Sequence, residues 1–115
     1  MAKVYMHGTI GFAETVNLLS SKVPDCGLSC SLSDSADHRI GDVRVSVLVF
    51  EKYFMRSSNY ASLTLVVSGR DGDVGVDIIG AGARQSLLSF TSWGTEESFV
   101  HAASDILSEH GFSFR

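Results

Sequence analysis

The chain has 115 residues and a mass of 12.4 kDa, with a formal net charge of −4 and a pI of about 5.4. We expect a single domain, 1–115, which is long enough to bury an apolar core without metal ions or disulfides. The acidic balance and the scattered cationic residues argue against nucleic acid binding. No apolar run is long enough for a secretory signal or a membrane span, so we expect a cytoplasmic protein that does not bind membranes.

The first quarter of the chain predicts a strand and then a helix. Apolar and polar residues alternate over 3–10, which is the period of a strand. The apolar stripe that follows has helical spacing and consists of Phe12, Val16, Leu19 and Val23. Pro24 ends this helix because its ring cannot continue the hydrogen-bond pattern.

The middle of the chain predicts four strands without a helix between them. A half-buried strand is expected at 28–33, followed by a polar loop at 34–41. Residues 42–56 contain a period-two row of Val43, Val45, Val47 and Val49, and we expect them to form the central strand. Further strands follow at 60–69 and 74–79.

The turn Asp71-Gly72 sets the register of the last two of these strands. Asp-Gly supplies the positive φ angles of a two-residue hairpin turn. This turn places Val67 opposite Val76 and Leu65 opposite Ile78, so both apolar rows share one face.

The preceding hairpin needs a different connection if the four valines are to face the core. A two-residue loop would place the valines on the face of Ser62 and Thr64. We therefore expect an odd-length or bulged connection near residues 57–59.

The C-terminal third predicts a last strand and a second helix. Residues 80–84, GAGAR, read as a flexible connection, and 86–92 as a strand. Thr95 is expected to cap a helix, and Gly111 is expected to end it with Phe112 in apolar contact.

These elements predict an α+β fold, a two-layer sandwich in the order β-α-β-β-β-β-α. We expect a mostly antiparallel sheet of five or six strands with both helices on one face, because no helix separates the middle strands. The other face then carries a candidate interface of five apolar residues: Leu48, Phe50, Phe54, Val66 and Ile79.

Three interpretations of this candidate interface remain open. The residues could be scattered surface hydrophobes of a monomer. They could join the face to itself across a two-fold axis. They could also line a curved sheet around an apolar ligand.

No motif nominates an active site, so we expect no catalytic residue, no metal site and no cofactor. The densest group of ligand-type side chains is Asp34, Asp37, His38 and Asp42, which we interpret as a solvated loop. Cys26 and Cys30 lie four residues apart, outside the Cys-x-x-Cys redox spacing, and are expected to be reduced thiols.

The stretch from Ile40 to Gly69 resembles a family of small bacterial proteins of uncharacterised function. Its most specific pieces are Gly41-Asp42-Val43-Arg44 and Phe50-Glu51-Lys52-Tyr53, and the resemblance extends to Trp93-Gly94-Thr95-Glu96. It implies a cytoplasmic bacterial protein and carries over no activity or catalytic residues.

The leading hypothesis from the sequence is a non-enzymatic interaction domain that forms a homodimer through its open sheet face. The alternative is a carrier of a small apolar ligand, with a cavity between the helices and the sheet.

Overall fold

The structure is a computed structural model that describes residues 2–26, 29–54, 58–82 and 89–115. The helical elements are α1 (Phe12–Lys22), the short 3₁₀ helix η1 (Val23–Cys26) and α2 (Ser89–Ser108). The strands are β1 (Ala2–Gly8), β2 (Cys30–Ile40), β3 (Val43–Phe54), β4 (Asn59–Arg70), β5 (Asp73–Gly82) and β6 (Ser113–Phe114).

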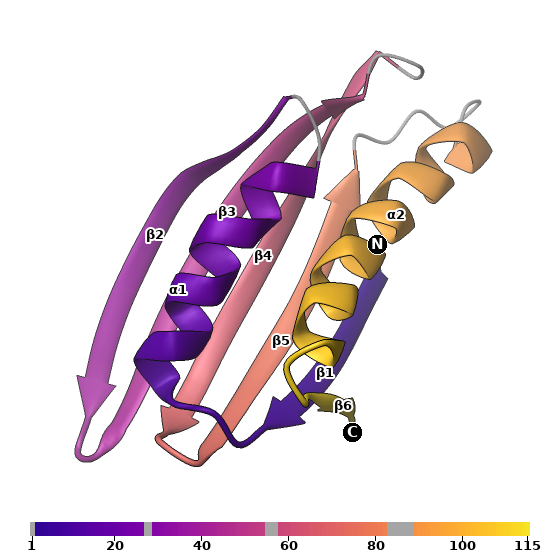
Figure 1. The fold of residues 1–115 in the computed structure, drawn as a ribbon. Coiled ribbons are helices and arrows are strands. Elements are labelled where there is room, and N and C mark those ends of the chain that lie inside the picture. The colour runs from indigo at the N-terminus through magenta and orange to yellow at the C-terminus, as the bar shows by residue number, and fades with distance from the viewer. Residues whose placement is uncertain (1, 27–28, 55–57, 83–88) are drawn as a thin grey trace.

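One six-stranded antiparallel sheet forms the first layer, and α1 and α2 lie side by side on one of its faces (Figure 1). The α+β sandwich and its element order confirm the fold expected from the sequence. The strand order is β2-β3-β4-β5-β1-β6. The prediction that β3 is the central strand is therefore wrong, because β3 lies second from one edge. The core fills the space between the helices and β1, β3, β4 and β5.

The predicted β4–β5 hairpin is confirmed. Arg70 pairs with Asp73 around the Asp71-Gly72 turn, and Gly72 has φ +87. Val67 pairs with Val76 and Leu65 with Ile78, and all four side chains are buried beneath the helices.

The predicted β3–β4 register is wrong. Phe54 pairs with Asn59, so four residues, 55–58, separate the two strands, and this number is even. Leu48 consequently pairs with Leu65, and Phe50 with Leu63. The face of β3 that packs against the helices is therefore the opposite one from the face that we expected.

Leu48 and Phe50 are core residues, which removes them from the candidate interface. Their exposed fractions are 3% and 0%. The physical reason is size: burying Leu and Phe removes more apolar surface from water than burying two valines of the alternate row. Each valine of that row is only partly buried, on the face away from the helices.

Two cations at the ends of the inner row of β3 find partners beside the helices. The Arg44 guanidinium lies 4.5 Å from the centre of the Phe12 ring at the start of α1. Lys52 Nζ donates a hydrogen bond of 3.1 Å to the Cys26 carbonyl oxygen in η1. These contacts accommodate the two cations at the ends of the row, so that the apolar residues between them can be buried.

β2 is longer and more exposed than the sequence predicted. The strand continues through the expected loop at 34–41 and ends at Ile40, with a register shift between Leu32 and Asp34. Every residue from Ser31 to Ile40 is exposed, because α1 packs over β3, β4 and β5 and does not cover β2 (Figure 1).

The C-terminal prediction is half right. Residues 83–88 lie outside the described residues, and 89–92, expected in a strand, begin α2. Thr95 therefore lies inside this helix and does not cap it. The predicted end is confirmed, since Gly111 has φ +88 and Phe112 is buried, donating its N–H to the Leu107 carbonyl.

The N-terminus of α1 is capped from a distant part of the chain. The Phe12 N–H donates a 2.8 Å hydrogen bond to Asp71 Oδ1, which comes from the β4–β5 turn. Gly11, the N-cap residue, has no side chain that could do this. A carboxylate at this position also favours the positive end of the helix dipole.

Replacing Asp71 with Ala is expected to lower the free energy of unfolding by about 1 kcal/mol, because one helix N–H loses its acceptor. Equilibrium unfolding in urea measures this change. Asp71→Asn, which keeps an acceptor and a residue suited to the turn, is the matched control and should lose less. Equal losses in the two variants would show that the cap contributes nothing.

Candidate functional site

The sheet face opposite the helices carries a continuous band of β-branched side chains. We call it the valine band, and it comprises Val43, Val45, Val47, Val49, Val66 and Ile79. Directly paired residues point to the same face of a sheet. Val47 pairs with Val66, and Ile79 pairs with Thr64, so the band runs across β3, β4 and β5.

The valine band is half-buried by its own neighbours and is not covered by a helix. Each member is partly exposed, whereas the apolar side chains of the inner row of the same strands are almost fully buried. Both helices lie on the other side of the sheet (Figure 1). β-branched side chains of this kind are short and stiff on a pleated surface.

The residues predicted for the interface divide into three groups. Val66 and Ile79 lie on the open face, as expected, although no observation tests whether they form an interface. Leu48 and Phe50 lie in the core. The side chain of Phe54 lies outside the described residues.

The four valines of β3 are surface residues, although the sequence predicts them in the core. Their period-two row is uniformly apolar, which is typical of a buried face. The alternate row contains Arg44, Ser46 and Lys52, which made it look like the solvated face. Period alone separates two faces of a strand and does not say which one is buried.

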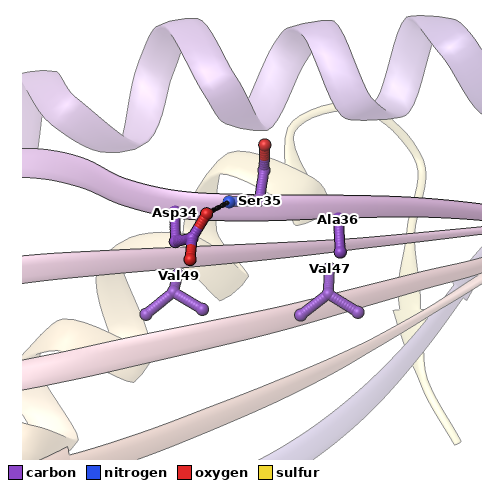
Figure 2. Close-up of a pocket in the computed structure, with 5 residues that line it drawn as sticks. All are labelled: Asp34, Ser35, Ala36, Val47 and Val49. Atoms are coloured by element: carbon purple, nitrogen blue, oxygen red, sulfur yellow. Dashed lines mark hydrogen bonds between the residues drawn. The ribbon is translucent and has the colours of Figure 1, made fainter.

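A shallow hollow lies on the open face between β2 and β3. It is lined by Asp34, Ser35, Ala36, Val47 and Val49. Figure 2 shows four of these side chains pointing away from the helices, whereas Ser35 points toward them. Its volume of about 220 Å³ is below the 300–1,000 Å³ that is typical of small-molecule pockets. The hollow therefore does not favour the carrier alternative.

Charged residues gather at the end of the open face where the β2–β3 and β4–β5 turns lie. Arg70 forms an ion pair with Asp42, and His7 Nε2 lies 2.5 Å from Asp73 Oδ1. Arg115 donates to His7 Nδ1 at 3.4 Å. These contacts fit an imidazole that carries its proton on Nε2 and donates it to Asp73.

The contacts of Asp73 hold the pKa of its carboxyl below the ordinary value of 3.8. The hydrogen bond from His7 is the largest cause, and the positive charges of Arg70 and Arg115 act in the same direction. A carboxyl with a lowered folded-state pKa contributes stability above its unfolded-state pKa. That contribution is lost as pH falls through the folded-state pKa.

His7→Ala is expected to raise the pKa of Asp73 toward 3.8, because it removes the largest cause of the shift. Carboxyl-detected NMR titration measures this pKa directly. Arg70→Ala is the control and should raise the pKa less, since a charge without a hydrogen bond acts more weakly here. An unchanged titration of Asp73 in His7→Ala would exclude the contact from the folded protein in solution.

The two cysteines lie where η1 meets the start of β2, and both pack against the core with free thiols. The Cys30 thiol donates to the Val23 carbonyl at 3.4 Å. Burial, followed by the neighbouring Cys26 thiol, raises the pKa of Cys30 to about 12. Since the thiolate is the nucleophile, Cys30 is an inert structural thiol at neutral pH.

Iodoacetamide at pH 8 is expected to modify Cys30 at least about tenfold more slowly in the folded protein than in denaturant, because few molecules carry the thiolate. Peptide mass spectrometry over time follows each cysteine separately. Equal rates in the two conditions would contradict the buried, protonated state.

The ligand-type side chains of β2 do not converge. Asp34 and His38 pair with Val49 and Val45 and lie on the open face, whereas Asp37 pairs with Ser46 and points to the helical side. In the described part of the chain, no three His, Cys, Asp or Glu residues are arranged to hold a metal ion. Among the helices described, none combines the length and apolar character needed to cross a membrane.

The fold and the open face define a two-layer α+β domain with one sheet surface uncovered. The family model described as a family of unknown function, DUF6054, matches residues 1–111, and the chain belongs to this family. No curated protein matches the sequence.

Proposed function

We propose that this protein is a non-enzymatic interaction domain that self-associates through the valine band. The observation that carries the proposal is the uncovered row of four valines on β3, continued by Val66 and Ile79 on the neighbouring strands. An apolar band that no helix covers fits an interface. A second copy presents the same band, so a two-fold axis brings like apolar surfaces together.

The architecture supports a second copy as the occupant. Both helices lie on one side of the sheet, so the other side can approach another sheet directly. Two sheets packed face to face would cover the bands at the ordinary spacing of about 10 Å between sheets.

The setting proposed for this interaction domain is the cytoplasm of a bacterium. The resemblance centred on Ile40 to Gly69 supports the bacterial origin. The free thiols of Cys26 and Cys30 support a reducing compartment, where disulfides rarely persist.

Val66→Lys tests the interface with little risk to the fold. Val66 pairs with Asp77 on β5, so a lysine at this position gains an opposite charge within its own sheet. In the complex, the same ammonium group would be buried against the valine band of the second copy, where one neighbouring carboxylate does not replace its lost hydration. We expect the variant to halve the mass of the assembly and to raise its dissociation constant about 100-fold or more.

Native mass spectrometry and sedimentation equilibrium measure these two quantities. Asn17→Lys is the matched control, because it adds the same charge at an exposed position on α1, on the other side of the molecule. Thermal unfolding confirms that both variants are folded. A wild-type protein that is monomeric at high micromolar concentration, or a Val66→Lys assembly of unchanged mass, would overturn the proposal.

A further inference from the structure

β2 is an unusual edge strand. It has 11 residues, pairs with β3 alone among the described strands, and is exposed on both faces from Ser31 onward. Leu32 and Ile40 have exposed fractions of 41% and 75%. Exposure of this extent is unexpected for a strand that contributes so little to the core, because ordering each residue costs roughly 1–2 kcal/mol in backbone entropy.

The outer edge of β2 offers a regular ladder of backbone groups. From Asp34 to Ile40 the pairing with β3 is uninterrupted, so alternate N–H and C=O groups point outward from the sheet. Protected edges are usually short, are broken by proline or by bulges, or carry charged side chains. This segment contains no proline, and the register shift between Leu32 and Asp34 lies just before it. It does carry Asp34, Asp37, His38 and Arg39, so a strand can pair here only in a register that gives these side chains suitable partners.

A second copy can extend the sheet at this edge only in certain registers. Two β2 strands related by a two-fold axis run antiparallel, and paired residues must lie on the same face of the joint sheet. Because successive residues alternate between faces, the axis must pass through a residue and not between two residues.

We infer that β2 pairs with β2 of a second copy about a two-fold axis at Ala36. Asp34 of each copy then lies opposite His38 of the other copy, and Ser35 of each copy lies opposite Asp37 of the other. Histidine keeps at least one N–H donor in every protonation state, so the Asp34 carboxylate gains a hydrogen-bond donor. Regular pairing in this register covers residues 34–38 of both strands, because the register shift between Leu32 and Asp34 lies just beyond it.

The neighbouring registers match less well. An axis at Asp37 places this carboxylate opposite itself, which is unfavourable. An axis at His38 also pairs five residues, 36–40, and brings Asp37 opposite Arg39, but it places the two imidazoles opposite each other and leaves Asp34 without a partner. An axis at Ser35 leaves Asp34 opposite Ala36 and His38 opposite Leu32, so neither polar side chain has a partner.

This edge contact goes beyond the proposed function, because it uses a different surface and a different axis. It would join two sheets into one of twelve strands with all four helices on one side. Ala36 pairs with Val47, so the valine bands of the two copies would meet across the seam. If both contacts formed in one closed assembly, the result would be a tetramer with two stacked sheets. Its D2 symmetry is common among oligomers.

A cysteine scan along β2 tests the register in the full-length Cys26→Ser/Cys30→Ser background. Single cysteines are placed at Ser35, Ala36, Asp37, His38 and Ile40, and each variant is incubated with oxidised glutathione. Only the residue on the axis faces its own copy, at the roughly 4.5–5.5 Å that a disulfide accepts. We expect Ala36→Cys to form covalent dimers at least about tenfold faster than Ile40→Cys, whose copies would lie roughly 27 Å apart.

Ser35→Cys and Asp37→Cys should cross-link slowly, because their copies lie roughly 7–8 Å apart on the diagonal. A maximum at any position other than Ala36 would overturn the register. Cross-linking that is equally slow at all five positions would overturn the edge contact.

A charge exchange provides a second measurement in the Ala36→Cys variant. His38→Asp places two carboxylates opposite each other and should slow cross-linking about fivefold. The double change Asp34→His/His38→Asp restores the pair with the same composition and should restore the rate. A double variant as slow as His38→Asp would overturn the pairing of these two side chains.

The Val66→Lys background separates this contact from the proposed function. Val66 lies two strands away from β2, so cross-linking through Ala36→Cys should persist in it. Persistent cross-linking with an unaltered assembly mass would refute the valine band and leave the edge contact intact. Loss of cross-linking in the Val66→Lys background would overturn the inference that the β2 edge contact forms independently of the valine band.

Discussion

The pairing of Leu48 with Leu65 and of Phe50 with Leu63 is the constraint on which the rest of the structure depends. It brings four large side chains under the two helices, where each has an exposed fraction of 3% or less. Because side chains alternate along a strand, the same pairing turns the four valines of β3 to the opposite face. The register of β3 against β4 thus determines both which residues form the core and which form the valine band proposed for self-association.

The polar and charged residues in the inner row of β3 show how the structure accommodates this register. Arg44 and Lys52 belong to the inner row, yet their cations lie at the two ends of the first helical segment. Ser46 is buried between them, and its hydroxyl has no hydrogen-bond partner among the described residues. Leaving such a hydroxyl unsatisfied costs about 1–3 kcal/mol, which the burial of Leu48 and Phe50 offsets.

The two proposed contacts have a common origin in how the helices are placed. α1 and α2 cover β1, β3, β4 and β5 from one side only. The open face therefore keeps an apolar band, and β2 keeps an unpaired edge with both of its faces exposed. The proposed contacts would cover both surfaces with a second copy of the chain, each about a two-fold axis.

The sequence by itself determined the element order, the antiparallel sheet with two helices on one face, and the β4–β5 register. These follow from local signals: residue periodicity, the proline and glycine that end the helices, and the Asp71-Gly72 turn. Only the tertiary structure decided which face of β3 is buried, how far β2 extends, and that Asp71 caps α1. Both rows of β3 are apolar enough to be buried, so the choice depends on the helices packed against them, and local sequence does not encode that packing.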